Sequence, residues 1–371
     1  MKIGIITYWN SKENYGQLLQ CYALQRFLIK EHHEPFLIKY KNDYEPQKIS
    51  PLSKFFSYII NFPAYVKYAL HLYSNQRNRK YYDANSVELR NFNSFVERYI
   101  RSTETEYGRK DLYQNNLNAE AFICGSDQIW GSEDDIYYLS FVPEGKRIIA
   151  YAPSFGGSMS FSKQFLPKLK NYLSRFHFLG IREQSGVDYC QSLGFNEAVK
   201  VVDPTLLLDK NDYEVLRIKT NYTKPYVFLY LLGNPCACKV SEVFKFAEKH
   251  NLDVVYVASQ DQNDAYKKVY PQIGEWIDLL AKSSFVITNS FHCTVFSLIY
   301  QRKVMAIPLI GAYKRMNTRI EELLACANLQ SAVYRGNIDN VYSMEYDFSV
   351  FQNYREKETF KSKAYLTKVL Q

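Results

Sequence analysis

Short runs of apolar, β-branched or aromatic residues alternate with amphipathic segments along most of the chain. This alternation is typical of parallel sheets that carry helices on their faces. In the first half, residues 16–30 show apolar side chains at helical spacing and predict a helix. The runs that predict strands in this half are residues 2–8, 35–40, 119–124, 147–151 and 178–182. We therefore expect an α/β protein whose first half contains one open sheet.

The alternation begins again in the second half and predicts a second sheet. Its expected strands are residues 200–202, 226–231, 252–257, 285–288 and 303–308. Its expected helices are residues 240–250, 274–281, 294–300 and 318–327. Two doubly wound domains that face each other bind ligands in the cleft at the carboxyl ends of their strands. We expect domains at residues 1–195 and 196–350, and a helical segment at residues 351–371 that packs back on the first domain.

Residues 45–110 interrupt this alternation with Tyr-rich helical sequence in which cations outnumber anions. An aromatic, apolar run at residues 55–66 is followed by Lys67 and by the basic cluster at residues 77–80. A segment of this kind can lie on an anionic membrane surface. The alternative is an insertion that covers the first sheet, with its apolar stripe buried and its cations in solvent.

Composition and charge narrow the class of partner. The chain has 371 residues, of which 47% are hydrophobic and 23% charged, so it can bury two full cores and is not disordered along its length. Its net charge of +8 favours phosphate-bearing or otherwise acidic partners. No basic run or nucleic-acid motif accompanies the charge, so no nucleic acid is expected. Tyrosine, at 33 residues, suits sugar or headgroup surfaces because its ring is apolar and its hydroxyl polar.

The cysteines and the apolar segments indicate a compartment. The 7 cysteines are odd in number and scattered, which fits a reducing cytoplasm. Cys236 and Cys238 form one close pair without the partner ligands of a zinc site, so no metal is expected. The N-terminal apolar run covers only residues 3–9, and no apolar segment reaches membrane-spanning length. We expect a cytoplasmic protein, peripheral at the inner face of the membrane if residues 45–110 dock there.

Two loops of the first domain carry polar groups beside predicted strands. Asn14, Tyr15 and Gly16 stand between the first strand and its helix, where a glycine lets backbone N–H groups approach a ligand and the helix dipole adds positive potential. A simple turn with Asn14 as helix cap explains the same residues. Asp127, Gln128 and Trp130 follow a buried strand. A carboxylate, an amide and a large aromatic ring are groups that bind sugars. Asp127 can act as a base or merely cap a helix.

Two further positions suit an anion. Arg182 ends a strand, where its planar guanidinium can bind phosphate or carboxylate through bidentate hydrogen bonds. The alternative is a structural ion pair with Glu183. After the strand ending at Thr288, a helix opens with Ser290, His292 and Thr294. Hydroxyls, an imidazole and free N–H groups are expected to converge there on an anion-binding point. His292 can gain a proton with a bound phosphate and then donate it, unless it is a core or capping residue.

These motifs resemble those of the polysaccharide pyruvyl transferase family, and they occur in family order over nearly the whole chain. The matching residues are 14–25, 125–130, 150–152 with 154–156, 182–183, 203–205, 290–292 and 319–320. The resemblance implies two Rossmann-like domains arranged as in GT-B glycosyltransferases. It also implies transfer of pyruvate from phosphoenolpyruvate onto two hydroxyls of one sugar, which forms a cyclic ketal and releases phosphate. No cofactor is implied beyond this donor substrate.

The resemblance also implies roles for particular residues. The donor lies mainly on the second domain, and its candidate ligands are Arg182, Ser290, Thr294 and Arg319. His292 is the candidate acid that protonates the methylene carbon of the donor, and Asp127 the candidate base. The loops of the first domain face the acceptor, a glycan or a polyprenyl-diphosphate-linked oligosaccharide of capsule or exopolysaccharide synthesis. The candidate acceptor-binding residues are Asn14, Tyr15, Gly16, Gln128 and Trp130.

Two positions depart from the family pattern. Cys293 stands where many relatives have Gly, and Ser290 stands where characterised branches often have Arg. Arg315 or Arg319 must then supply the missing charge for the donor. A GT-B-type glycosyltransferase that uses a nucleotide sugar is an alternative because one fold carries many chemistries. The two departures motivate a further alternative, a non-catalytic glycan-binding relative with a degenerate site.

Overall fold

The first half of the chain forms a six-stranded parallel sheet. The computed structural model describes residues 1–43, 83–156, 161–233, 236–259 and 264–371. The strand order is β2-β1-β3-β4-β5-β6, and every pairing is parallel. The strands are β1 (Lys2–Ile6), β2 (Glu34–Leu37), β3 (Ala121–Cys124), β4 (Arg147–Tyr151), β5 (Phe178–Ile181) and β6 (Val199–Lys200). The central strand β3 is buried throughout, as its unbroken apolar sequence requires.

Helices cover both faces of this sheet. Alternate residues of β4 divide between two cores, since Ile149 and Tyr151 pack in the same core as α1 whereas Ile148 and Ala150 pack with α7 and α8. The helices of this half are α1 (Tyr15–Lys30), α4 (Ser86–Arg90), α5 (Phe92–Tyr99), α6 (Arg109–Gln114), α7 (Phe165–Ser174) and α8 (Gln184–Ser192). Short 3-10 helices η2 (Ile129–Gly131) and η3 (Asp135–Tyr138) follow β3.

The second half builds a four-stranded parallel sheet of order β10-β9-β7-β8. Its strands are β7 (Tyr226–Tyr230), β8 (Asp253–Val257), β9 (Phe285–Thr288) and β10 (Val304–Ala306). The accompanying helices are α10 (Val240–Lys249), α11 (Ile273–Lys282), α12 (Phe291–Ile299), α13 (Thr318–Cys326) and α14 (Ile338–Ser343). The connecting 3-10 helices are η5 (Gly311–Asn317) and η6 (Gln330–Ala332). Both halves are Rossmann-like, and the class predicted from the sequence is confirmed.

Two predicted boundaries are wrong. The strand expected at residues 200–202 was assigned to the second sheet, but its first residue belongs to β6, which pairs with β5 at the edge of the first sheet. The helix expected at residues 294–300 begins earlier, at Phe291, because the Ser290 side chain accepts a hydrogen bond from the backbone N–H of Cys293 and caps the helix.

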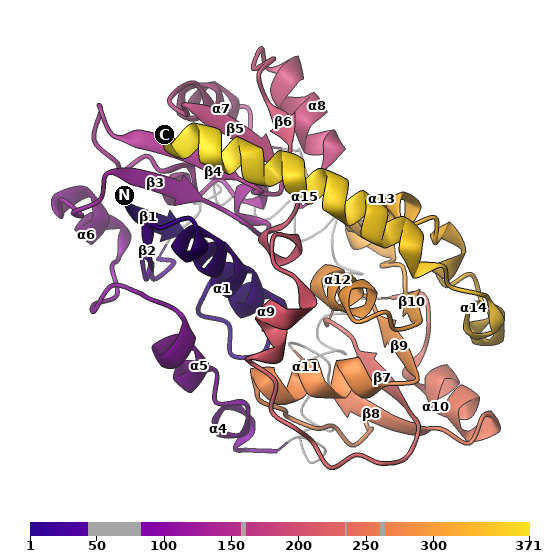
Figure 1. Cartoon of the computed structure of the whole chain (residues 1–371). Helices are drawn as coiled ribbons and strands as arrows, with labels where there is room; N and C mark the ends of the chain where they lie inside the picture. Colours follow the sequence, from indigo (N-terminus) through magenta and orange to yellow (C-terminus); the bar gives the residue numbers. More distant parts are fainter. Residues whose placement is uncertain (44–82, 157–160, 234–235, 260–263) are drawn as a thin grey trace, which may run out of the picture.

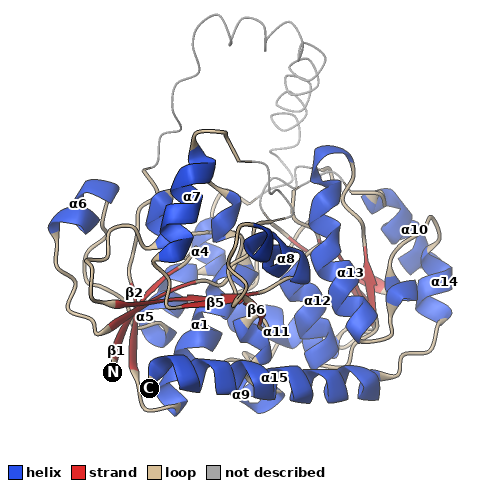
Figure 2. Ribbon diagram, turned by 90° about the horizontal axis from the view of Figure 1, so that it is seen from above, coloured by secondary structure: helices blue, strands red, loops and turns tan. Residues whose placement is uncertain are grey.

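A long helix and a short connection join the halves. The connection holds η4 (Pro204–Leu206) and α9 (Lys210–Glu214). The last helix, α15 (Phe348–Leu370), lies along both halves on one side of the molecule, as Figures 1 and 2 show. Near its end, the Tyr365 hydroxyl donates to the carbonyl of Ala150 in β4 at 3.2 Å, and Ser362 Oγ accepts from the backbone N–H of Val202 at 3.0 Å.

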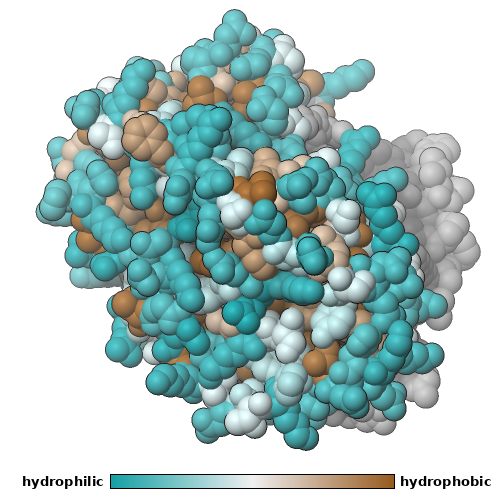
Figure 3. All heavy atoms as spheres, turned by 45° about the vertical axis from the view of Figure 1, so that its right-hand side comes forward, coloured by the Kyte–Doolittle hydropathy of each residue, from teal (hydrophilic) through white to brown (hydrophobic). Residues whose placement is uncertain are grey.

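The face of the molecule in Figure 3 is mainly hydrophilic, with apolar side chains dispersed among polar ones. Within the described ranges, no helix combines the length and the apolar character needed to cross a bilayer. The aromatic run at residues 55–66 and the basic cluster at residues 77–80, for which we predicted membrane contact, lie outside the described residues. Their docking stays a prediction.

Candidate active site

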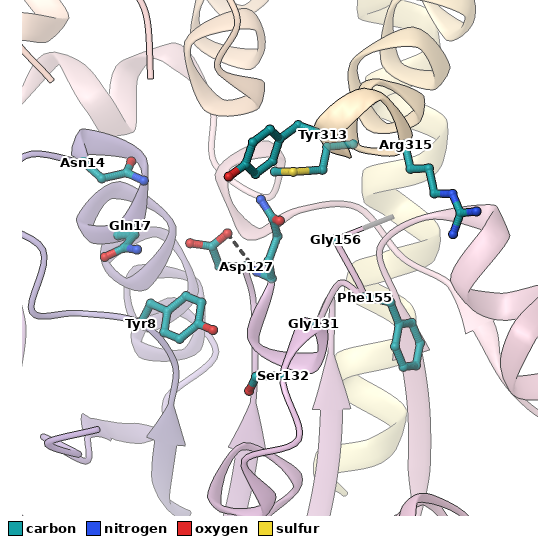
Figure 4. Close-up of a pocket in the computed structure, with 12 residues that line it drawn as sticks. Tyr8, Asn14, Gln17, Asp127, Gly131, Ser132, Phe155, Gly156, Tyr313 and Arg315 are labelled. Carbon is teal, nitrogen blue, oxygen red and sulfur yellow. Dashed lines mark hydrogen bonds between the residues drawn. The ribbon is translucent and has the colours of Figure 1, made fainter. Parts of the chain in front are cut away.

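An open pocket of about 560 Å³ lies between the halves, at the carboxyl ends of β1, β3 and β4. Figure 4 shows polar side chains from the first half across from Tyr313 of η5 in the second half, with Arg315 of the same helix on the side of Phe155 and Gly156. The volume falls within the range of small-molecule sites, roughly 300–1,000 Å³. The described residues that line it are Tyr8, Asn14, Gln17, Asp127, Gln128, Gly131, Ser132, Phe155, Gly156, Tyr313, Arg315 and Met316.

The loop after β3 places Asp127 in this pocket. Gly125 has a φ of 118°, and a Cβ there would lie 2.0 Å from the carbonyl oxygen of Tyr151, so only glycine fits. Asp127 itself has a φ of 71°, a left-handed conformation that side-chain-bearing residues rarely adopt. Its Oδ1 accepts from the backbone N–H of Gln128 at 2.8 Å, and its residue is 6% exposed. The loop thus holds a carboxylate at the pocket floor in a fixed direction.

Below the pocket, Asp203 is the centre of a buried polar cluster. Its Oδ1 accepts from the backbone N–H and the hydroxyl of Thr205, at 3.0 and 2.6 Å. Its Oδ2 accepts from Ser126 Oγ at 2.7 Å and from Arg182 Nη1 at 3.1 Å. Burial alone would raise the pKa of the Asp203 carboxyl, but the charges of His292 and Arg182 outweigh it and hold that pKa well below its usual range. Asp203 is therefore an anion that these donors share.

His292 lies in the first turn of α12 and packs directly on the start of α1. A Cβ on Gly16 would lie 2.3 Å from Nδ1 of the imidazole, so the absence of a side chain at Gly16 makes room for the ring. On its other side, Nε2 lies 3.5 Å from Oδ2 of Asp203 and makes no hydrogen bond within the described part of the chain. His292 thus has one buried nitrogen atom available to a ligand.

Two guanidinium groups flank this cluster. Arg182 Nε donates to Glu183 at 2.7 Å, and its guanidinium lies 4.6 Å from the centre of the Phe291 ring. Burial alone would lower the pKa of Arg182, but Glu183 and Asp203 raise it above its usual value. Nη2 of this nearly buried side chain makes no hydrogen bond to any described residue. The ion pair expected as the alternative for Arg182 is therefore present, and anion binding by the remaining donor, Nη2, stays a prediction.

Arg319 is a buried cation that donates hydrogen bonds to neutral groups. With the Gln128 amide oriented so that its oxygen faces the guanidinium, Nη1 and Nη2 donate to it at 2.7 and 3.0 Å. Nε donates to the Met316 carbonyl at 3.3 Å. Burial and the nearby charge of Arg182 lower the pKa of Arg319 to about 10. Because Gln128 also lines the pocket, its amide stands between the open space and a desolvated cation.

The other predicted site residues fall into two groups. Asn14 lines the pocket and caps α1 by accepting from the Gly16 N–H at 3.1 Å. In α12, Ser290 Oγ caps the helix and the Thr294 hydroxyl donates to the Ser290 carbonyl at 3.0 Å, so both hydroxyls are engaged within their own helix.

Tyr15 and Trp130 are not brought to the pocket where we expected them. Tyr15 is fully buried, stacks on Trp276 and donates to the Pro271 carbonyl at 2.7 Å. Trp130 is fully buried and donates to the Tyr137 carbonyl at 3.1 Å. Large aromatic rings with a satisfied polar atom stabilise a core, and these two do so at the domain interface and under the Asp127 loop.

Sequence reasoning missed several residues of the site. Asp203 was recognised within a motif but received no role, although a charged residue before Pro-Thr after a strand was the available signal. Tyr8 and Gln17 had no signal beyond their closeness to the first loop, and Tyr313 had none. No group of three or more His, Cys, Asp or Glu residues suited to a metal occurs among the described residues.

The comparisons with known proteins agree with this architecture. A family model described as polysaccharide pyruvyl transferase matches residues 14–309. A structure from Listeria monocytogenes, assigned as a UDP-N-acetylglucosamine 2-epimerase, is 9% identical with a TM-score of 0.51, over 97% of this chain and 90% of that one.

A second similar structure is the UDP-GlcNAc 2-epimerase of Methanocaldococcus jannaschii in complex with UDP-GlcNAc and UDP. It is 10% identical with a TM-score of 0.50, over 100% of this chain and 99% of that one. These similarities show the GT-B-like fold alone. No curated protein matches the chain.

Proposed function

Since the chain belongs to the polysaccharide pyruvyl transferase family, we propose that it transfers pyruvate from phosphoenolpyruvate to a sugar. Two hydroxyls of one sugar in a polysaccharide or lipid-linked oligosaccharide precursor are joined to C2 of pyruvate as a cyclic ketal, and phosphate is released. The observation that carries the proposal is the buried cluster of Arg182, Arg319 and His292 beside the pocket.

The charges of this cluster match those of the donor. Phosphoenolpyruvate brings a carboxylate and a phosphate, and buried guanidinium groups bind such anions strongly. Arg182 offers its unused Nη2, and Arg319 has neutral partners that an anion can replace. This supply of charge supports donor binding although Ser290 stands where some relatives have Arg. In this scheme the donor anion displaces the Gln128 amide from Arg319 as it moves inward from the pocket.

The reaction needs one acid and one base. His292 Nε2 gives a proton to the methylene carbon, so that this carbon becomes a methyl group and C2 becomes cationic. The first sugar hydroxyl bonds to C2 and gives its proton to Asp127. The bond between C2 and the phosphate oxygen then breaks, phosphate leaves, and the second hydroxyl bonds to C2 as its proton is taken up by solvent or phosphate. The ionised Asp203 lies 3.5 Å from Nε2 and offers the imidazolium an electrostatic partner.

The test uses the full chain and calorimetric titration with phosphoenolpyruvate. We expect binding that weakens at least about tenfold in Arg182→Lys, because an ammonium cannot reproduce the fork that contacts Glu183, Asp203 and the donor together. Lys168→Gln, an exposed position on α7, is the matched control and should bind as the parent does. Equal donor affinity in the parent and in Arg182→Lys would reject this site, and binding of a nucleotide sugar instead would favour a glycosyltransferase.

A further inference from the structure

We infer that the acceptor is an anionic saccharide, whose sugar packs on Tyr313 and whose anionic group binds Arg315. The inference rests on the proposed pyruvyl transfer and assigns a substrate class to the acceptor side of the same pocket. Both residues belong to η5, in the second half of the chain, whereas the acceptor residues predicted from sequence all belong to the first half.

Tyr313 presents an aromatic surface to a pocket otherwise rich in hydrogen-bonding groups. Its side chain is 42% exposed although it lines the pocket. Figure 4 shows the ring reaching into the space above Asp127, with the hydroxyl toward the side of Asn14. A sugar has hydroxyls at its edge and apolar C–H groups on its faces, so a ring on one side and amides and a carboxylate on the other suit it.

Arg315 supplies the charge. It is an exposed residue, and no carboxylate partner for its guanidinium occurs in the described ranges. Among the described lining residues it is the one cation, and Asp127 is the one carboxylate. Figure 4 places these two on opposite sides of the pocket. An acceptor whose hydroxyls donate hydrogen bonds to Asp127 therefore extends toward Arg315. The guanidinium of Arg315 can then bind an anionic group of the acceptor.

The donor does not account for this arrangement. Its carboxylate and phosphate are matched by Arg182 and Arg319, which are both buried in the cluster below the pocket. A pocket of about 560 Å³ also exceeds what a three-carbon donor fills. The space that the donor leaves in the pocket, and the Arg315 guanidinium that lines it, are therefore available to the acceptor.

Two sources can supply the acceptor anion: a phosphate at the reducing end of the sugar, or the carboxylate of a neighbouring acidic sugar. A guanidinium binds either in two-pronged fashion. The experiment separates them by calorimetric titration of the full chain with three disaccharide probes, neutral, phosphorylated and carboxylated. Each titration is done with and without phosphoenolpyruvate.

We expect at least one anionic probe to bind about tenfold or more tightly than the neutral one, and the tighter probe identifies the source. Arg315→Gln should abolish this difference. Lys314→Gln should keep it, because Lys314 is an exposed cation of the same helix that does not line the pocket. Tyr313→Ala should weaken all probes that bind, whereas Tyr313→Phe should keep their affinity.

Equal binding of neutral and anionic probes, loss of the difference in Lys314→Gln as much as in Arg315→Gln, or no binding by any probe would overturn the inference. These results concern the acceptor alone, and binding of phosphoenolpyruvate is measured separately. If phosphoenolpyruvate still binds and only the preference for an anionic sugar is missing, pyruvyl transfer stands without Arg315. If phosphoenolpyruvate fails to bind, the proposed function itself fails.

Discussion

Asp203 receives hydrogen bonds or charge from Ser126, Thr205, Arg182 and His292, which come from four separate segments of the chain. At the scale of single residues, this carboxylate joins the loop after β3, the connection between the halves and the first turn of α12. A buried anion with so many donors stabilises the fold only while it stays ionised.

We therefore predict a pH-dependent effect of Asp203→Asn. The folded-state pKa is held well below the unfolded value of about 3.9. The carboxylate therefore contributes its full stabilisation above about pH 5 and loses it gradually as the pH falls from the unfolded pKa toward the much lower folded pKa. At pH 7 the variant should lose about 3–5 kcal/mol of unfolding free energy, because Arg182 keeps only Glu183 as a buried anionic partner and His292 loses the carboxylate beside it. Urea unfolding should show this gap narrowing below about pH 4. The same gap at pH 7 and at about pH 2.5 would contradict the prediction.

The contact between Gly16 and His292 allows a second residue-scale prediction. Gly16→Ala would place a methyl group 2.3 Å from Nδ1 and force the imidazole away, although alanine favours a helix by about 1 kcal/mol. We expect a large loss of turnover with the fold retained, and about 10²–10⁴-fold loss in His292→Gln, which lacks an acid.

A double-mutant cycle tests whether the two changes act through the same ring. Because Gly16→Ala acts by displacing His292, it should add little to the loss of turnover once His292→Gln is present. Circular dichroism checks that each variant folds. Additive losses, or near-parent turnover in His292→Gln, would reject the acid role.

At the scale of elements, α15 ties the second half to the first sheet. Tyr365 donates to β4 and lies against Gly180 of β5, where a Cβ would come within 2.9 Å of its ring. Tyr365→Phe should lower the unfolding free energy by about 1 kcal/mol, because it leaves the Ala150 carbonyl without this donor, and should leave the KM for phosphoenolpyruvate unchanged.

The matched control for this prediction is Phe360→Ala on the same helix, whose side chain is 75% exposed. It should change stability by no more than about 0.5 kcal/mol. Thermal or urea unfolding compares the two variants. A loss in Phe360→Ala as large as that in Tyr365→Phe would show that the hydrogen bond to β4 is not what α15 contributes.

The elements that were predicted correctly owe this to local pattern, and the errors have non-local causes. Strands such as β3 and β7 are continuous apolar runs that are buried on both faces, so sequence alone marks them. The two-residue strand β6 is defined by its pairing with β5, which no local pattern contains. The expected range 294–300 leaves out the first turn of α12, because the start of this turn is fixed by the hydrogen bond from the Cys293 N–H to Ser290, which the apolar pattern does not contain.

The same distinction applies to the candidate site. Asn14, Asp127 and Gln128 follow strands of one sheet, so their meeting at the pocket could be predicted. The sequence does not determine whether the rings of Tyr15 and Trp130 face the pocket or the core, and the structure buries both in the core. Tyr313 reaches the pocket from the other half of the chain, and only the packing of the two halves brings it there.

At the scale of the whole molecule, loops of the first half pack against polar and charged side chains of the second half. Gln128 contacts Arg319 across this boundary, and Gly16 receives His292. The open pocket lies between the halves, and the buried cluster of Arg182, Asp203, His292 and Arg319 lies beside it. The proposed reaction therefore uses the pocket for the sugar and the cluster for the small anionic donor.

Transfer in deuterated water tests this account most directly. The full chain is incubated with phosphoenolpyruvate and an anionic oligosaccharide acceptor, and the product is analysed by mass spectrometry and NMR. Because the acid exchanges its proton with solvent, we predict a ketal whose methyl group carries one deuterium, with one phosphate released per ketal formed. A product whose methyl group contains no deuterium, or an acceptor that gains mass only from a nucleotide sugar, would contradict it.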